Sequence, residues 1–368
     1  MAERLSEKEQ VLLNLIQQDP YISQQELANT INISRPTVAN LISGLIKKGY
    51  IVGRAYVIAE KEPIVCIGGA NIDRKFYIKE EVQMGTSNPS KSSLSVGGVA
   101  RNIGENLGRL GQEVNLITSC GRDSDWAHIE EVTSPYMNLD YVIEISDART
   151  GSYTAVLDSS GEMILALADM DVYDSITPQI LEAQEPLLKR ASCIVADLNT
   201  PKDTLHYLNQ FAKTHEKPLV FIPVSSPKMR RLPDELSGVT WLITNRDETE
   251  TYFDVKITDM KTWEQALQQW LSLGVTNVII TNGKEGAILG NNEEVFHVPA
   301  IKTHKIVDVT GAGDAFSAAV IYSWLEGKTL KEIGRAGNVN AHKTLQSPYT
   351  VRQDLSANQL QQDMEELL

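Results

Sequence analysis

An Asp that follows a short glycine turn is the feature of this sequence with the clearest chemistry. The run Asp308-Val309-Thr310-Gly311-Ala312-Gly313-Asp314 precedes a segment of small residues that favours a helix. The glycines allow a sharp turn, so the first amide groups of the helix and the positive end of its dipole face one point. A resting phosphate there would be repelled by Asp314. We therefore predict that Asp314 accepts a hydroxyl proton while Gly311, Ala312 and Gly313 stabilise a transferring phosphoryl group; a simple helix cap is the alternative.

A second glycine cluster, Gly97-Gly98-Val99-Ala100-Arg101-Asn102, lies between a strand-like run and a helix-like segment. Two adjacent glycines let a small polyol approach the backbone closely. The Asn102 amide offers both a donor and an acceptor to sugar hydroxyl groups. Alone, this cluster would indicate a tight turn, but together with the downstream motif it predicts a binding site for an alcohol acceptor.

The two motifs together resemble the two signatures of the ribokinase (PfkB) family of carbohydrate and nucleoside kinases, and the resemblance covers about residues 63 to 365. It implies an ATP-dependent kinase that uses Mg²⁺. It also implies a ribokinase-like three-layer α/β sandwich with a small β lid, formed by about residues 72–97 and 140–168. In the family such lids pair between subunits, so the resemblance implies a homodimer.

The resemblance also assigns roles to residues at the predicted strand ends. Asp73, close to Asn71, matches the position whose carboxylate binds two vicinal sugar hydroxyl groups. Asn245 and Glu248 match a motif that orders Mg²⁺ and its waters, and Mg²⁺ retains most of its water in proteins. Thr281, Gly283 and Gly286 match a turn that binds the polyphosphate of ATP. Asn338 and His342 match the residues that line the adenine and ribose. Asp308, Thr310 and Ser347 match a loop that binds a monovalent cation, usually K⁺. An ordinary helix histidine is the alternative for His342.

Within this family the closer resemblance is to pseudouridine kinases. It rests on the motif Thr86-Ser87-Asn88-Pro89-Ser90-Lys91 and on residues 98–103, 157–163 and 169–170. A ribosyl acceptor explains Asp73 and Asn102, and the candidates to face a uracil-like base are Ser87, Asn88, Thr154 and Asp169.

Pseudouridine exposes an additional ring N–H, so the Asp169 carboxylate would discriminate it from uridine. Ile222 stands where pseudouridine kinases tend to carry Asp before Pro, which puts one polar contact in doubt. Ribose, a purine nucleoside, a sugar acid, and a sugar-sensing DNA-binding regulator that retains kinase activity remain open.

The elements that must position these residues alternate along the chain. Apolar runs typical of buried strands occur at residues 64–67, 114–118, 193–196, 219–222, 241–244 and 278–281, with helix-like segments at 102–110, 204–214, 262–273 and 315–325. This alternation predicts a parallel sheet covered on both faces, with ligands at the carboxyl ends of the strands.

The first sixty residues form a separate predicted domain. Ser6, Ser23 and Ser34 each precede a helix-like segment, and residues 50–58 resemble a hairpin with Gly53 and Arg54 at its tip. This order resembles a winged helix-turn-helix, with Arg35, Pro36, Thr37 and Asn40 on the recognition helix and Arg54 on the wing. DNA is therefore one predicted partner, and an interaction domain that does not bind DNA is the alternative.

Composition limits the remaining classes. The net charge is −14, whereas residues 1–60 contain equal numbers of basic and acidic side chains, so the kinase-like part (residues 61–368) is acidic and unsuited to non-specific nucleic-acid binding. No apolar run is long enough to span a bilayer. Cys66, Cys120 and Cys193 lie in apolar runs, which indicates buried thiols of a reducing, cytoplasmic environment.

Overall fold

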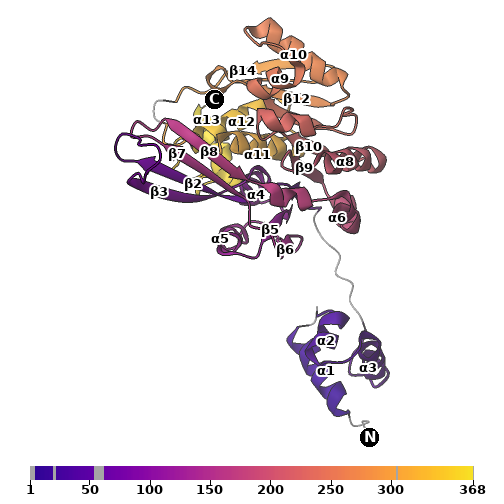
Figure 1. The fold of residues 1–368 in the computed structure, drawn as a ribbon. Coiled ribbons are helices and arrows are strands. Elements are labelled where there is room, and N and C mark those ends of the chain that lie inside the picture. Colours follow the sequence, from indigo (N-terminus) through magenta and orange to yellow (C-terminus); the bar gives the residue numbers. More distant parts are fainter. Residues whose placement is uncertain (1–4, 20–21, 54–61, 304–305, 368) are drawn as a thin grey trace. The chain divides into compact units, whose positions relative to one another are not determined.

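The computed structural model describes residues 5–19, 22–53, 62–303 and 306–367. The chain divides into two compact units, Met1–Glu60 and Lys61–Leu368, which are described separately below (Figure 1). Within the described ranges, no helix combines the length and the apolar character that crossing a membrane requires.

The described part of the N-terminal unit, residues 5–19 and 22–53, contains three helices, α1 (Glu7–Gln18), α2 (Gln24–Thr30) and α3 (Arg35–Lys47). All three begin where the sequence predicts, because Ser6, Ser23 and Ser34 accept hydrogen bonds from amides of the first turns. The helices enclose a small apolar core of Leu12, Leu13, Leu27, Ala28, Val38, Ile42 and Leu45. Most of the predicted hairpin, including Arg54, lies outside the described residues.

A large sheet forms the centre of the second unit, with its strands in the order β14-β13-β12-β11-β10-β9-β1-β4. Neighbouring strands are parallel from β4 to β12, and β13 and β14 are antiparallel at one edge. The strands are β1 (Ile64–Ile67), β4 (Val114–Ile117), β9 (Cys193–Asp197), β10 (Leu219–Ile222), β11 (Trp241–Asn245), β12 (Asn277–Thr281), β13 (Ala287–Gly290) and β14 (Val295–Val298).

Helices cover both faces of this sheet, because its strands are apolar on both sides. One face packs on α6 (Pro178–Ala183), α7 (Glu185–Arg190), α8 (Lys202–His215), α9 (Arg246–Phe253) and α10 (Met260–Ser272). The other packs on α4 (Val99–Arg109), α5 (Ser124–Thr133), α11 (Ala312–Leu325) and α12 (Leu330–Leu345), and α13 (Ala357–Leu367) packs on α12. Short 3₁₀ helices are η1 (Asp171–Ser175), η2 (Ser226–Arg231) and η3 (Gly283–Glu285). The predicted three-layer α/β sandwich is confirmed.

A second sheet of four strands projects from this body and forms the lid (Figure 1). Its strand order is β3-β2-β7-β8, with β2 (Asn71–Ile78), β3 (Ser90–Gly97), β7 (Ser152–Leu157) and β8 (Met163–Asp169). The second predicted lid segment, 140–168, starts earlier than the lid strands do. Its first part forms β6 (Ile143–Ile145), which pairs with β5 (Ser119–Gly121) in a separate small sheet.

Candidate active site

The glycine turn before α11 has a left-handed geometry that its sequence favours. Gly311 caps the helix with φ of 81°, a left-handed conformation that favours glycine. A Cβ atom at this position would lie 2.1 Å from the backbone oxygen of Thr350, so no other residue fits. Gly313, by contrast, is exposed and faces open space. The first turn of α11 can therefore present its amides to an anion at Gly313, with Asp314 next to it.

Asp314 forms a hydrogen bond to the second predicted motif. Nδ2 of Asn102, on α4, donates to Oδ2 of Asp314 at 2.8 Å. Burial is the main effect that raises the pKa of the Asp314 carboxyl to about 7. The charges of Asp197 and Asp73 also raise this pKa, whereas the hydrogen bond from Asn102 lowers it. A carboxyl group with a pKa near neutrality is suited to accept a proton during turnover.

The predicted acceptor-binding residues meet at the base of the lid. Nδ2 of Asn71 donates to Oδ1 of Asp73 at 2.7 Å, and Asp73 packs so closely on Gly97 that a Cβ atom there would lie 2.3 Å from Oδ2. Gly98 has φ of 99° and lies against the Gly69 backbone. Burial raises the pKa of the Asp73 carboxyl to about 6, and Lys75 opposes this rise. Asp73 and Asn102 therefore bound one small polar site beside Asp314.

Asp197 holds these glycine segments together, and the sequence analysis did not identify it. Its Oδ2 accepts hydrogen bonds from the backbone N of Gly69 and of Ala100, both at 2.9 Å, and Oδ1 accepts one from Asn199 N at 2.8 Å. The side chain is fully buried. Burial raises the pKa of this carboxyl, and the three amide hydrogen bonds oppose that effect. An Asp directly after the apolar run 193–196 was the available signal, because strand ends carry the site.

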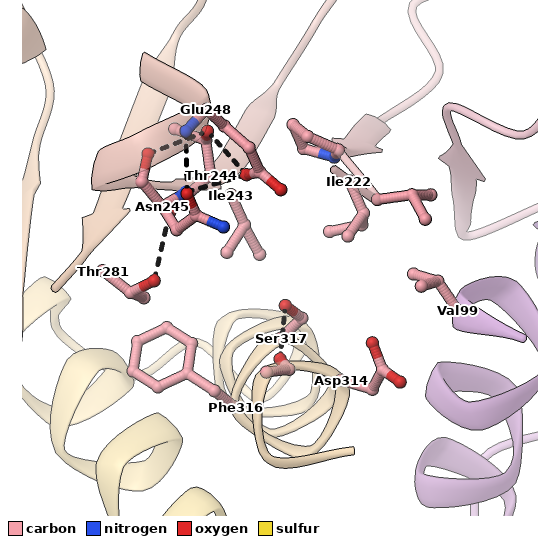
Figure 2. A pocket seen from close by; sticks show the side chains of 13 residues that line it. Val99, Ile222, Ile243, Thr244, Asn245, Glu248, Thr281, Asp314, Phe316 and Ser317 are labelled. Atoms are coloured by element: carbon pink, nitrogen blue, oxygen red, sulfur yellow. Dashed lines mark hydrogen bonds between the residues drawn. The ribbon is translucent and has the colours of Figure 1, made fainter. Parts of the chain in front are cut away.

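A cavity of about 160 Å³ lies between Asp314 and the predicted magnesium residues (Figure 2). Asp314, Phe316 and Ser317 border it from α11, and Asn245 and Glu248 border it from the opposite side. Oε2 of Glu248 accepts hydrogen bonds from Asn245 N at 2.9 Å and from Thr244 Oγ1 at 3.0 Å. Glu248 is thus a buried helix-capping residue at the cavity wall, and burial raises the pKa of its carboxyl.

Magnesium fits this arrangement without a dedicated cluster of ligands. Among the described residues, no group of three or more His, Cys, Asp and Glu side chains could hold a metal ion. An ion that retains its waters and binds ATP phosphates needs only one or two carboxylates from the protein. Glu248, across the cavity from Asp314, would hold Mg²⁺ through water, and the ion would supply charge neutralisation for the phosphates.

The predicted nucleotide residues lie along a groove that continues from this cavity. Thr281 borders the cavity of Figure 2, a second cavity of about 430 Å³ and a third of about 750 Å³. The largest cavity is also lined by Gly283, Gly286 and Asn338, and its walls contain apolar side chains suited to a flat base: Ile301, Ile306, Val309, Ala341 and Leu345.

His342 is the exception among the predicted nucleotide residues, because it does not line these cavities. It is buried, and its Nδ1 lies 2.8 Å from Oγ1 of Thr303. Thr303 itself lines the largest cavity. His342 therefore lies behind the cavity wall, as expected for an ordinary helix histidine.

The loop predicted to bind a monovalent cation already contacts a cationic side chain. Lys75, on β2 of the lid, forms an ion pair of 2.9 Å with Asp308. Although burial acts in the opposite direction, hydrogen bonds from Lys75 and Thr310 hold the pKa of the Asp308 carboxyl below its usual value. Ser347 lies in an adjacent turn, where its Oγ accepts a hydrogen bond from Tyr349 N at 3.1 Å. Two of the residues predicted for K⁺, Asp308 and Thr310, thus contact each other, and a lysine contacts both.

The strand register separates the lid into two faces. Asp73 pairs with Tyr153, and Tyr153 pairs with Ala168, whereas Ile72, Ser152 and Asp169 form the adjacent row. Successive side chains of a strand point to opposite faces, so Asp169 lies on the face opposite to Asp73 and Lys75. The prediction that Asp169 binds the base is therefore not supported. Thr154 pairs with Arg74 and so lies on the same outer face as Asp169, away from Asp73.

The motif around Asn88 also lies away from Asp73. Ser87 and Asn88 belong to the loop between β2 and β3, beyond the paired ends Ile78 and Ser90. Five residues of strand separate this end from Asp73, roughly 16 Å at 3.3 Å per residue. The Asn88 side chain bonds to Gln83 N and O, both at 2.8 Å, and Ser87 is exposed. These residues shape the tip of the lid, and within one chain they do not reach the acceptor site beside Asp73.

Comparisons with known proteins agree with this geometry. The family model described as pfkB family carbohydrate kinase matches residues 61–357, and a model described as winged helix-turn-helix DNA-binding matches residues 5–52. The chain belongs to the pfkB family of carbohydrate kinases. It is an ATP-dependent sugar or nucleoside kinase with an N-terminal winged helix-turn-helix.

Two curated relatives from Escherichia coli (strain K12) cover most of the chain. A pseudouridine kinase is 30% identical over 300 residues, which are 81% of this chain and 95% of the relative. An uncharacterised sugar kinase, YeiI, is 29% identical over 90% of this chain and 91% of its own length.

Solved structures show the same fold. A carbohydrate kinase from Agrobacterium tumefaciens is 33% identical, with a TM-score of 0.72 over 83% of this chain and 98% of that one. Arabidopsis thaliana ribokinase, solved with ribose and ATP, has a TM-score of 0.74 at 19% identity, over 83% of this chain and 99% of that one.

Proposed function

We propose that this kinase phosphorylates the 5′-hydroxyl group of pseudouridine. The observation that carries the proposal is the 2.8 Å hydrogen bond between Asn102 and Asp314, which joins the acceptor-binding motif to the phosphoryl-transfer motif. The E. coli pseudouridine kinase, matched over 95% of its length, supports pseudouridine among the ribosyl acceptors. Purine nucleosides are the alternative acceptors, because a guanosine-inosine kinase of Exiguobacterium acetylicum is 26% identical to this chain over 91% of its own length.

The residues support an in-line transfer. Asp73 and Asn102 hold the ribose hydroxyl groups, so the 5′-oxygen lies near Asp314. This oxygen forms a bond to the γ-phosphorus of ATP while the bond to the β,γ-bridging oxygen breaks and ADP leaves. Asp314 accepts the hydroxyl proton, and amides of the turn at Gly311 and Gly313 stabilise the charge on the transferring group.

Selectivity for the base is the part of the proposal that the lid must supply. The side chains that share the inner face with Asp73 include Ser95 and Tyr153, by strand pairing with Asp73. Their hydroxyl groups can accept from the ring N–H that pseudouridine exposes and uridine lacks. Leaving such a group unpaired costs about 1–3 kcal/mol, so we expect a preference of about tenfold to a hundredfold for pseudouridine.

A panel of acceptors tests this function. ADP release with pseudouridine, uridine, inosine, adenosine and ribose gives kcat/KM for each acceptor, with the Asp314→Asn variant as the inactive control. We expect pseudouridine to give the highest value. A higher value for ribose or a purine nucleoside would refute the pseudouridine assignment and leave the kinase assignment intact.

The outer face of the lid supports a homodimer. Leu94, Leu165 and Leu167 lie on this face by their strand pairings, and their side chains are 52%, 51% and 56% exposed. Large exposed apolar side chains gathered on one face of a sheet are typical of a protein interface. A second copy of the chain, paired through the same face, would cover it with two-fold symmetry.

DNA is the proposed partner of the N-terminal unit. Arg35, Thr37 and Asn40 are exposed on α3, where a recognition helix presents its side chains to the major groove. Lys48 forms an ion pair of 2.9 Å with Glu9, which reduces the basic character of the unit. We therefore expect weak non-specific binding. Fluorescence anisotropy with DNA fragments at two salt concentrations, for the protein and for Arg35→Ala, tests this role.

A further inference from the structure

Lys75 completes a closed polar cluster in the loop before the glycine turn. Its Nζ atom is 2.9 Å from Oδ2 of Asp308 and 3.1 Å from Oγ1 of Thr310. The other oxygen of the carboxylate, Oδ1, accepts hydrogen bonds from Thr310 N and Thr310 Oγ1, at 2.9 and 2.7 Å. Both oxygens of Asp308 are therefore engaged, and one of them is engaged by an ammonium group.

The course of β2 explains why this lysine lies here. Asn71, Asp73 and Lys75 alternate with Ile72 and Arg74, so the first three share the inner face of the lid. Arg74 points the other way and forms an ion pair of 2.6 Å with Asp125 on α5. The same strand thus carries the predicted ribose ligand and, two residues later, the ammonium group that contacts the loop of Asp308.

A free monovalent cation does not fit these oxygens while Lys75 is in place. Two unit charges of the same sign at about 4 Å repel each other by roughly 4 kcal/mol near a protein surface. The lysine is part of the same chain, so placing its ammonium group at the loop does not cost the translational freedom that binding an unattached ion costs. The side chains of Lys75 and Asp308 are only 24% and 33% exposed, which protects the pair from screening.

We propose that the Lys75 ammonium group replaces the monovalent cation at this loop, so that phosphoryl transfer by this kinase does not require K⁺. Thr310 directly precedes Gly311, the residue that caps α11 and begins the anion-binding turn. An ammonium group fixed on residues 308–310 therefore positions this turn. Because it comes from the lid, it also makes the shape of the turn depend on the position of β2. Lys75 is a positioning residue in this scheme.

The first experiment compares monovalent cations. Turnover of the full-length protein is measured in KCl, NaCl and choline chloride, with an acceptor that supports ADP release. We expect equal rates for the unaltered protein in the three salts. Activation by KCl of several-fold over both other salts would overturn the proposal, because the loop would then bind K⁺ itself.

The second experiment removes the ammonium group. Lys75→Met retains most of the apolar stem, and we expect about a tenfold to a hundredfold lower rate in NaCl, since a displaced turn misaligns the reacting groups. NH₄Cl or KCl should restore a large part of the loss, because either cation can occupy the vacated position. Lys79→Met, an exposed lysine just after the same strand, is the matched control and should behave like the unaltered protein in every salt.

Thermal unfolding gives a readout that needs neither acceptor nor ATP. The midpoint of Lys75→Met should be higher in NH₄Cl than in NaCl, whereas those of the unaltered protein and of Lys79→Met should be equal in the two salts. An active Lys75→Met, or a folded variant whose loss no cation restores and whose midpoint no cation shifts, would overturn the proposal. If no acceptor gives turnover, the proposed function fails, and the thermal comparison still decides the role of Lys75.

Discussion

Replacing Asp314 by Asn should separate the chemistry of this carboxyl group from its effect on stability. The amide retains the shape and can still bond to Asn102, but it cannot accept a hydroxyl proton. Loss of a general base lowers turnover by about 10²–10⁴-fold, with little change in nucleoside binding. In the unaltered protein, kcat/KM should fall as the pH drops below about 7, because burial raises the pKa of Asp314 to about 7.

The same variant should unfold at a higher temperature at neutral pH. The pKa of Asp314 rises from 3.8 to about 7 on folding, so the folded state binds the proton more tightly than the unfolded state. Ionised Asp314 therefore destabilises the fold, increasingly so between about pH 4 and pH 7 and by a constant amount above. Three pKa units correspond to about 4 kcal/mol. Since part of the Asp314 side chain reaches water, we expect the ionised carboxylate to lower the free energy of unfolding by about half of this value.

Thermal unfolding at pH 4 and at pH 8 measures this difference. The midpoint of Asp314→Asn should exceed that of the unaltered protein at pH 8 by about 4 °C, and the two should coincide near pH 4. Asp140→Asn, at an exposed loop position, is the control. Near-normal turnover of Asp314→Asn would refute the role of general base. A midpoint difference that does not depend on pH would refute the burial argument for the raised pKa.

Three further outcomes are expected. Gly311→Ala should abolish turnover and lower the unfolding midpoint, because its Cβ atom would lie 2.1 Å from Thr350 O; an active variant would contradict the turn geometry. Deletion of residues 1–60 should leave kcat/KM within about twofold, because the unit has its own core, whereas a folded but inactive truncation would show that the unit completes the active site. Leu94→Glu combined with Leu167→Glu should halve the mass of the particle measured by light scattering, and an unchanged mass would exclude dimerisation through this face.

The sequence predicted those parts of the fold and site that local residue order determines. The buried strands are nearly continuous apolar runs, so their positions were predicted within a residue or two. The turn at Gly311 and the acceptor motif at Gly97 and Gly98 were also predicted, because Gly98 and Gly311 have positive φ angles and Gly97 has no room for a side chain. The contact between Asn102 and Asp314 was not itself predicted, although each residue had been placed in a motif of one site.

The features that sequence analysis missed depend on the pairing of distant segments. Which way Asp169 faces depends on the register of three lid strands, and a shift of one residue would reverse it. Asn88 is polar and lies in a motif, but its amide is used within its own loop. Lys75 and Asp308 are 233 positions apart, so no local pattern joins them. Asp197 was overlooked because its partners are backbone amides, which residue identity does not reveal, so its place after a strand was the only sequence signal.

The alternation along β2 has a consequence for how such chains can change length. Asp73 and Lys75 share the side of the lid that faces the proposed acceptor site, and Arg74 on the other side forms an ion pair with Asp125 on α5. One residue inserted or deleted within β2 would reverse the faces of the residues beyond it, so Asp73, the proposed ribose ligand, and Lys75 could not both keep their present side. Insertions and deletions in relatives should therefore fall in the loop 79–89, and never inside this strand, even where its residues differ. The spacing of β2 is under tighter restriction than its composition.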